Sequence, residues 1–380
     1  MNNTLKYWKE AATLIVAART SHGHFPYIQP QVQFPNQQNN TSDYEVLLLK
    51  RSQKSGFMPN AFVFPGGNIE SSDFSSDWIK VFSRYEQKPN FGLGLVKQHD
   101  NRSPMFTADS SKFGSLIPGE VATRICAIRE TFEESGILLV VPENFNSEDN
   151  QHLVEVTDQD KEKLSKWREE VQRNPSQFIQ MCKEMRCMPN IWALKEWSNW
   201  LTPVISQGVK SRRFDTAFFI CCLNAKPAVS DDNKEVTSFK WWTPTEALED
   251  YKSHKIWIPP PQFYELSRLC HFAPINELHK FIVNRSLEGC ERWMPVIAQC
   301  EDGIVHTLPG DDLYPEDPDL TGEKQTVVCS NETIENLIQK GGRFHRLVLI
   351  DGKPTLLVNI KPKYKHINPL TIESESKNKL

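Results

Sequence analysis

A helix expected from about residue 121 to residue 135 constrains the fold more than any other stretch of this chain. Its apolar residues recur at i, i+4, i+7 and i+11, which places them on one stripe of the helix. They are Val121, Ile125, Ile128 and Phe132. Gly136 then stands where a C-cap glycine ends a helix, and the apolar run 137–141 predicts a buried strand.

Three acidic residues lie on the opposite side of this expected helix. At about 100° per residue, Glu130, Glu133 and Glu134 fall within an arc of roughly 100°. Such a face is most often only solvated, but like charges at this spacing repel one another. Hard divalent cations such as Mg²⁺ or Mn²⁺ prefer clustered carboxylate oxygens and often share substrate phosphates.

A glycine pair supplies the second half of the pattern. Gly66 and Gly67 follow the apolar run 62–64, so a strand is expected to lead directly into them. Glycines at the end of a strand let the backbone come close to an anionic ligand. The glycine pair and the three glutamates together predict a metal-assisted phosphate site.

These two segments resemble the signature of the Nudix hydrolases, which cleave phosphoanhydrides joined to a nucleoside. The resemblance rests on the Pro65-Gly66-Gly67 turn, on Glu70, and on Arg-Glu-x-x-Glu-Glu-x-Gly over residues 129–136. It implies an α/β fold, the Nudix α/β/α sandwich with a mixed sheet. The chain departs from the family pattern by inserting residues 71–118 after Glu70, by the spacing of Glu120, which is one residue too far from Arg129, and by a threonine at position 131.

The resemblance also implies roles for the acidic residues of the signature. Glu130 and Glu134 are expected to be the principal ligands of Mg²⁺ or Mn²⁺, and Glu133 a further ligand or the residue that orients water. Arg129 is expected to hold these carboxylates in place. Glu70 is a further candidate ligand and Glu120 a weaker one, while the general base cannot be identified from the sequence.

Substrate contacts are expected from glycines and arginines. Gly66 and Gly67 would approach the diphosphate. Arg51 follows a leucine-rich strand, as an arginine does in related coenzyme A hydrolases, and is expected to contact a phosphate; a surface arginine is the alternative. Arg212 and Arg213 are candidates for a 3′-phosphate, because guanidinium groups bind phosphate in a bidentate manner.

Features along nearly the whole chain resemble one Nudix subfamily, the peroxisomal acyl-coenzyme A diphosphatases. They lie in segments 191–203, 212–223, 258–265, 308–311 and 362–366. The implied reaction is metal-dependent hydrolysis of coenzyme A and acyl-coenzyme A to 3′,5′-ADP and (acyl-)4′-phosphopantetheine. Two alternatives remain: a Nudix hydrolase of another substrate, such as ADP-ribose, a dinucleotide or an RNA cap, and a non-catalytic Nudix binding module.

The chain is expected to divide into three parts. Residues 1–274 form the Nudix domain, with the insertion 71–118 as a partly ordered lid or a disordered loop, and a helical insertion at about 157–200. Residues 275–360 form an α+β extension packed on it, and residues 361–380 a flexible tail. Helices are expected at 157–173, 175–185, 191–199, 260–269 and 275–284, with a short one after Pro244. Strands are expected at 11–18, 44–50, 62–64, 216–223 and 239–242, with hairpins around Asp302-Gly303 and Asp351-Gly352.

Charge and composition limit the partners. A net charge of −4 argues against a general nucleic-acid binder, which would usually be basic. The apolar run 11–18 is too short to span a membrane. Nine cysteines without regular spacing indicate free thiols in a reducing compartment. The last three residues, Asn378, Lys379 and Leu380, resemble the S-K-L address and predict a peroxisomal import receptor as partner and a peroxisomal location, with cytoplasm or mitochondrion as alternatives.

Overall fold

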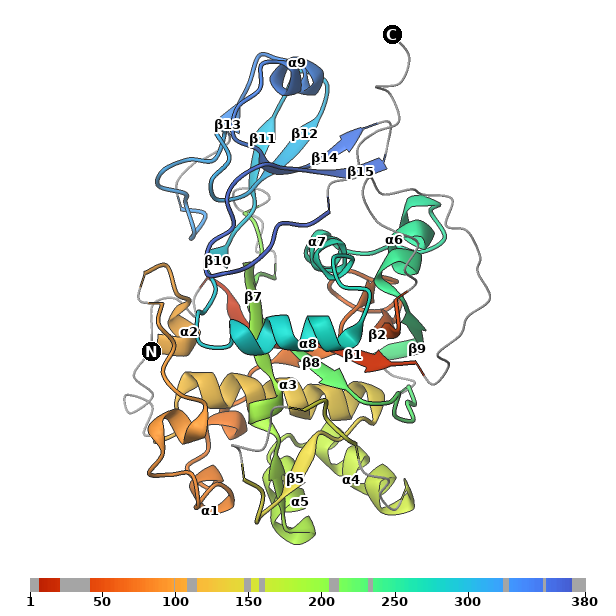
Figure 1. Ribbon diagram of the computed structural model, residues 1–380, viewed down its shortest axis with the longest axis vertical. Coiled ribbons are helices and arrows are strands. Elements are labelled where there is room, and N and C mark those ends of the chain that lie inside the picture. The colour runs from red at the N-terminus through yellow and green to blue at the C-terminus, as the bar shows by residue number, and fades with distance from the viewer. Residues whose placement is uncertain are drawn as a thin grey trace.

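A mixed sheet of eight strands lies at the centre of the computed structural model, which describes residues 7–20, 42–98, 100–107, 115–146, 152–156, 161–204, 212–231, 235–323, 328–350 and 353–370 (Figure 1). The strand order is β10-β7-β8-β1-β2-β3, with β4 paired to β1 and β9 paired to β2. β1 runs parallel to β8 and antiparallel to β2 and β4, so the predicted mixed sheet is confirmed. The strands are β1 (Lys9–Arg19), β2 (Tyr44–Arg51), β3 (Phe62–Val63), β4 (Gly66–Asn68), β7 (Lys195–Leu201), β8 (Phe214–Leu223), β9 (Val236–Trp242) and β10 (Arg292–Trp293).

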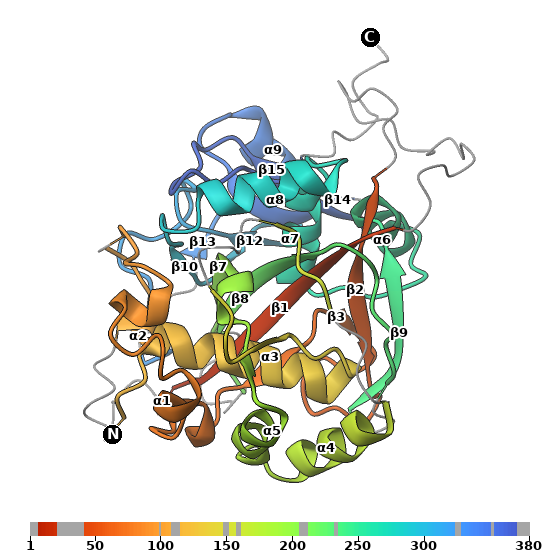
Figure 2. The ribbon, with the colours of Figure 1, turned by 60° about the horizontal axis from the view of Figure 1, so that its bottom comes forward.

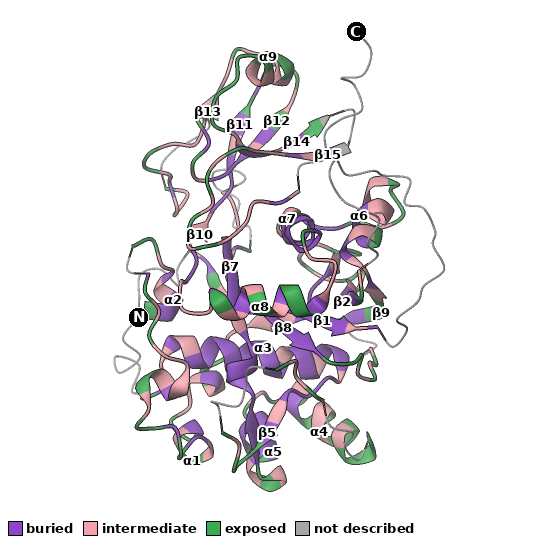
Figure 3. Ribbon diagram, in the orientation of Figure 1, coloured by how far each residue is buried: buried purple, intermediate pink, exposed green. Residues whose placement is uncertain are grey.

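Both faces of this sheet are buried. Successive side chains of a strand point to opposite faces, and in β1 Leu14 and Val16 join one hydrophobic core while Ile15 and Ala17 join the other. Figure 3 shows the central strands and α3 as largely buried. A strand covered on both sides is almost uniformly apolar, as the run 11–18 is.

Helix α3 (Gly119–Ser135) covers the first face, with α4 (Lys161–Arg173) and α5 (Gln177–Met185) beyond it (Figure 2). The helix ends as predicted, because Gly136 adopts a left-handed conformation with φ of 76° and donates to the carbonyl of Phe132. The strand predicted at 137–141 is wrong in extent. Only β5 (Val140–Pro142) pairs, with β6 (Cys187–Pro189), in a separate two-stranded sheet.

Three helices cover the second face: α6 (Pro244–Lys252), α7 (Pro260–Leu269) and α8 (Ile275–Asn284). All three follow the sequence prediction. α6 begins with a capping box in which the side chains of Thr243 and Glu246 bond each other's backbone N–H groups. Ile275 and Leu278 of α8 pack in the core against the sheet.

The insertion 71–118 packs into the first core. It contains η2 (Ser71–Phe74), α1 (Trp78–Val81), η3 (Pro89–Gly92) and α2 (Pro104–Thr107). Trp78, Phe82 and Phe106 are buried with the apolar stripe of α3. The described part of the insertion is therefore a fixed part of the core, which contradicts the disordered-loop alternative and does not support the lid.

The helix predicted at 191–199 is wrong. Residues Ile191–Ala193 form a single 3₁₀ turn, η6, and β7 follows as a strand of the main sheet. Nearly every residue of β7 is buried, so the segment shows no periodicity that separates a strand from a helix. Trp197 and Trp200 are core residues.

The C-terminal part forms a second sheet in the order β13-β11-β12-β14-β15, at the top of Figure 1. Both predicted hairpins are confirmed, β11–β12 and β14–β15. The elements are β11 (Val296–Gln299), β12 (Ile304–Thr307), β13 (Val328–Cys329), α9 (Ile334–Gln339), β14 (His345–Ile350) and β15 (Lys353–Val358).

Residues 361–370 do not form a free tail. His366 Nε2 bonds the carbonyl of Trp197 at 3.1 Å, and the N–H of Leu370 donates to the carbonyl of Ser267 at 3.1 Å. The expected flexible tail is therefore wrong for this part. Asn378, Lys379 and Leu380 lie outside the described residues.

Two expectations concern the chain as a whole. Eight of the nine cysteines are described as free and buried, in agreement with the prediction of free thiols. Among the described helices, none combines the length and apolar character needed to cross a bilayer.

Candidate active site

The glycine turn and the second half of α3 meet at close range. The N–H of Gly66 donates to Glu134 Oε2 at 2.9 Å. A Cβ added to Gly67 would lie 2.5 Å from Cδ and Oε2 of Glu130, so no larger residue fits without moving this carboxylate. A Cβ on Gly66 would clash with the backbone of β1. Both glycines are therefore required for the contact, and the structure confirms that the two halves of the signature come together.

Arg129 binds the acidic residues around it. Its Nη1 donates to Glu130 Oε1 at 2.8 Å and to Glu133 Oε1 at 2.7 Å. Its Nε and Nη2 each donate to Asp73 at 2.9 Å, and Nη2 also reaches the carbonyl of Asn68 at 3.0 Å. The guanidinium is 1% exposed, so these bonds fix it in one position. The orienting role expected for Arg129 agrees with this geometry.

The three glutamates carry more negative charge than this one arginine offsets. Burial raises the pKa of Glu130 to about 7, against the opposing effect of Arg129. Burial also raises the pKa of Glu133, again opposed by Arg129. The pKa of Glu134 is raised well above its usual value by burial and by the charge of Glu130. Raised pKa values of this kind indicate a site that favours a bound cation or proton.

The donor set fits a hard divalent cation, although the carboxylates are not assembled around a single point. Among the described residues, no group of three or more histidine, cysteine, aspartate or glutamate side chains is arranged to hold a metal. Glu130 and Glu133 turn toward Arg129, and Glu134 turns toward Gly66. Each of these bonds uses one carboxylate oxygen, and the second oxygen belongs to the class of ligand that hard cations prefer.

The two weaker ligand candidates lie elsewhere. Glu120, in the first turn of α3, binds Arg102 Nη2 at 2.7 Å and Asn90 Nδ2 at 2.5 Å. Ten residues of helix separate Glu120 from Glu130, which corresponds to about 15 Å. Glu70 is exposed and precedes η2, where it forms a capping box with Asp73.

The arginines predicted to bind substrate separate into two groups. Arg51 donates to Ser55 Oγ at 2.8 Å and to the carbonyl of Phe57, and its charge lowers the pKa of Glu134. Arg212 is exposed and packs over the same loop, since a Cβ on Gly56 would lie 2.9 Å from its Nη1.

Arg213 points away from this site. It is buried, and it donates to the carbonyl of Thr202 at 3.0 Å and to the carbonyl of Leu320 at 2.8 Å. These bonds occupy the guanidinium and join β8 to the C-terminal part. The structure therefore does not support Arg213 as a phosphate ligand.

Two acidic residues of this site were missed in the sequence. Asp73 Oδ2 accepts from the N–H of Glu70 at 2.9 Å, as a residue in the first turn of a helix does. Its pairing with Arg129 across 56 residues leaves no local signal. The charge of Glu235 raises the pKa of both Glu133 and Glu134, and its carbonyl accepts from the N–H of Ser52 at 2.8 Å. Glu235 stands in no recognisable motif.

Comparison with known proteins identifies the family. Residues 8–269 match the NUDT19 Nudix domain, and residues 297–359 match the NUDT19 C-terminal domain. The chain is 46% identical over 392 residues to the acyl-coenzyme A diphosphatase NUDT19 of Gallus gallus, covering 100% of this chain and 99% of that protein. It is 40% identical to the human protein of the same name, covering 95% and 94%.

Among solved structures, a Nudix hydrolase from Alicyclobacillus acidocaldarius aligns with a TM-score of 0.49 and 19% identity, covering 72% of this chain and 96% of that one. The two domain matches and the two relatives, each over nearly the full length, lead to one conclusion: this chain belongs to the NUDT19 family of Nudix hydrolases.

Proposed function

We propose that this protein hydrolyses the diphosphate bond of coenzyme A and its acyl esters, releasing 3′,5′-ADP and (acyl-)4′-phosphopantetheine. The observation that carries the proposal is the contact of Gly66 and Gly67 with the carboxylates of Glu130 and Glu134 around Arg129. The choice of substrate is supported by relatives that are named acyl-coenzyme A diphosphatases and match nearly the whole chain.

In this reaction a water oxygen forms a new bond to one phosphorus, and the bond from that phosphorus to the bridging oxygen breaks. Mg²⁺ or Mn²⁺, when bound, supplies positive charge that neutralises the diphosphate oxygens. Glu130 and Glu134 would hold the cation, with Glu133 as a further ligand or as the group that orients the water. Arg129 keeps Glu130 and Glu133 in place through its bonds of 2.8 and 2.7 Å.

Glu235 is a candidate to accept the proton of the attacking water. Its carboxylate acts on both Glu133 and Glu134, and it lies outside the helix that carries the proposed ligands. Replacing Glu235 with Gln removes the base but keeps the shape of the side chain. The expected result is a fall in kcat of about 100-fold or more with little change in metal affinity. Unchanged kcat would exclude Glu235 from this role.

Arg51 and Arg212 are proposed to bind substrate phosphates, Arg51 the diphosphate and Arg212 the 3′-phosphate. Arg51 is the last residue of β2 and bonds the loop that follows it, and Arg212 packs over this loop. The charge of Arg51 also lowers the pKa of Glu134. Guanidinium groups suit this task because they present paired donors to phosphate oxygens.

The function is tested by product analysis of the purified protein with coenzyme A, acetyl-coenzyme A, ADP-ribose and a capped RNA, each with Mg²⁺, Mn²⁺ or a chelator. Metal-dependent release of 3′,5′-ADP from the first two substrates is expected. Glu134→Gln serves as the inactive control, and its folding is checked by circular dichroism. A preference for ADP-ribose or capped RNA would overturn the substrate, and turnover by Glu134→Gln at the wild-type rate would overturn the metal site.

We also propose a peroxisomal location through an import receptor that binds Asn378, Lys379 and Leu380. Support comes only from the sequence, because lysine and leucine match the last two positions of the S-K-L address. Deleting the three residues from a fluorescently tagged chain is expected to release it into the cytoplasm. An unchanged distribution would refute this proposal without affecting the proposed activity.

A further inference from the structure

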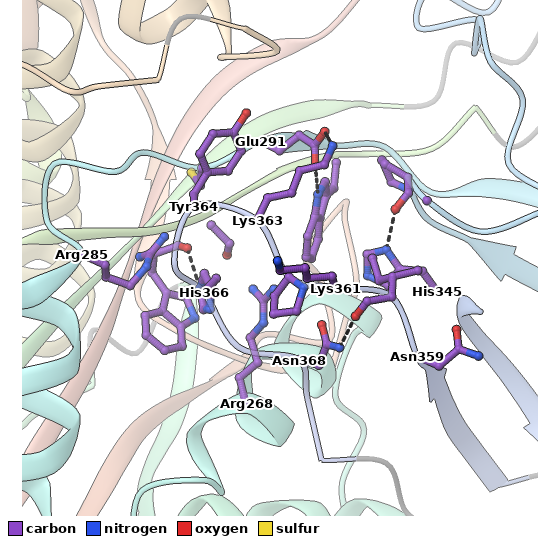
Figure 4. Close-up of a pocket in the computed structure, with 18 of the residues that line it drawn as sticks. Arg268, Arg285, Glu291, His345, Asn359, Lys361, Lys363, Tyr364, His366 and Asn368 are labelled. Carbon is purple, nitrogen blue, oxygen red and sulfur yellow. Dashed lines mark hydrogen bonds and ion pairs between the residues drawn. The ribbon is translucent and has the colours of Figure 1, made fainter. Parts of the chain in front are cut away.

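A cavity of about 310 Å³ lies on the side of the main sheet that α7 and α8 cover. The segment 359–368 forms one wall, with β7, the end of α8, the segment before β10 and β10 itself around it (Figure 4). None of the residues assigned above to the candidate active site lines this cavity. The carboxylates of α3 belong to the opposite face of the sheet, where α3 packs.

Basic side chains dominate the charged groups of this cavity. They are Arg268, Arg285, Arg343, Lys361 and Lys363, against the single carboxylate of Glu291. Lys363 pairs with Glu291 at 2.7 Å, Arg343 with Asp312 at 2.7 Å, and Arg268 with Glu265 at 3.2 Å. Arg285 and Lys361 have no ion pair among the described residues, so the cavity has an excess of positive charge.

Two buried polar atoms on its wall have no hydrogen-bond partner among the described residues: Arg285 Nε and Ser198 Oγ. Arg285 is 2% exposed and Ser198 is 3% exposed. The other nitrogens of Arg285 donate only to carbonyls, Nη1 to Glu196 at 2.7 Å and Nη2 to Gly289 at 3.0 Å. An unpaired buried donor is destabilising, and more so when it is charged. An anion in the cavity would supply the hydrogen-bond acceptor that Arg285 Nε and Ser198 Oγ lack among the described residues.

The two histidines of the cavity do not add charge. His345 bonds Tyr264 Oη through Nε2 at 2.9 Å and the carbonyl of Pro309 through Nδ1 at 2.8 Å, and burial lowers its pKa to about 4. His366 accepts from the N–H of Ile367 at Nδ1, and burial lowers its pKa well below the usual value. Both rings are therefore neutral and contribute flat walls.

We propose that this cavity is a second binding site, for a small organic phosphate with a flat or apolar body. The phosphate would accept hydrogen bonds from Arg285 Nε and Ser198 Oγ and face Lys361, while the body would lie against Trp197, Trp293 and Tyr364. Such a ligand would join the segment 359–368 to the main sheet. This site is separate from the proposed catalytic one and does not depend on it.

The test is isothermal titration calorimetry of the full chain in the presence of a chelator, which removes the metal from the catalytic site. The probes are adenosine 3′,5′-bisphosphate, 4′-phosphopantetheine, inorganic phosphate and adenosine. At least one of the two organic phosphates is expected to bind, and more tightly than inorganic phosphate or adenosine. The first two probes distinguish the nucleotide from the pantetheine source.

Variants locate the binding. Ser198→Ala removes a hydroxyl that has no hydrogen-bond partner in the described part of the chain, so it is expected to fold normally and to weaken binding about tenfold, the effect of losing one hydrogen bond to a charged group. Lys361→Ala, at an exposed position, is expected to weaken binding several-fold. Lys365→Ala is the matched control, because Lys365 is exposed, pairs with Glu288 and does not line the cavity. Arg51→Ala should also leave this binding unchanged.

Binding that falls in Ser198→Ala and Lys361→Ala but not in the two controls would support the site. The proposal is overturned if no phosphate binds, or if Ser198→Ala and Lys361→Ala bind like the wild type. If adenosine binds as tightly as the organic phosphates, the cavity does not recognise a phosphate. If inorganic phosphate binds as tightly as they do, the cavity does not recognise the organic part of the ligand.

Discussion

The ion pair between Asp73 and Arg129 links the insertion to the proposed metal ligands and can be tested directly. Asp73 accepts from Nε and Nη2 of Arg129, both at 2.9 Å, and the two side chains are 2% and 1% exposed. The change Asp73→Ala removes the two bonds and leaves a buried guanidinium that still faces Glu130 and Glu133.

The expected loss of stability follows from this burial. Removing one partner of a buried pair typically costs about 3–5 kcal/mol, because the remaining charge stays desolvated. Glu130 and Glu133 still neutralise part of the charge of Arg129, so the lower end of this range, about 3 kcal/mol, is expected. Freed from one side, Arg129 would also hold the carboxylates less firmly, and a fall in activity of about 10- to 100-fold is expected, as for other residues that orient metal ligands.

Urea unfolding followed by tryptophan fluorescence measures the first effect, and hydrolysis of coenzyme A as a function of metal concentration measures the second. Asp77→Ala is the matched control, since Asp77 lies four residues away in the same insertion but is half exposed and pairs with Lys80 on the surface. Asp77→Ala should have the same free energy of unfolding and the same activity as the wild type. If Asp73→Ala unfolds within about 1 kcal/mol of the wild type and keeps its activity, this interpretation of the pair is refuted.

Three further predictions concern the Gly67 contact, the two adjacent arginines and the titration of Glu130. In Gly67→Ala the new methyl group would displace the Glu130 carboxylate, so metal-dependent activity should fall at least tenfold while the protein stays folded; wild-type kinetics would contradict the close contact. Arg212→Ala should raise KM for substrates with a 3′-phosphate but not for their dephosphorylated forms. Arg213→Ala should instead lower the free energy of unfolding by about 2 kcal/mol, because the carbonyls of Thr202 and Leu320 lose their donor. A higher KM in Arg213→Ala and a loss of stability in Arg212→Ala would refute these roles. The pKa of Glu130 near 7, raised from 4.5, means that the folded protein binds more protons than the unfolded one between these values, so stability without metal should fall as pH rises through this window. A divalent cation competes with that proton, and the increase in Tm that it causes should therefore grow from about pH 5.5 to about pH 8; an increase that is independent of pH would exclude Glu130 as a ligand.

Much of the fold could be predicted from the sequence, because the decisive patterns are local. The 3.6-residue period of α3, its C-cap glycine, the capping box of α6 and the Asp-Gly turns of the two hairpins each depend on neighbours in the chain. The strand at 195–201 could not be predicted in this way. It is buried on nearly all sides, and its aromatic run carries no period that separates strand from helix.

Some features of the candidate site could likewise be predicted from the sequence, and others could not. The sequence alone determined that Glu130, Glu133 and Glu134 share one face of a helix, because helical geometry suffices for that inference. That the glycine turn would meet them was implied by the resemblance to the Nudix signature, and the structure shows the contact. Only the tertiary structure decided which distant groups join them. Asp73 bonds Arg129 across 56 residues, the charge of Glu235 acts on Glu133 and Glu134, and of the adjacent arginines Arg212 packs over the loop after β2 while Arg213 is buried. These contacts depend on how the insertion and the C-terminal part pack against the sheet, and packing between distant segments leaves no periodic pattern in the sequence.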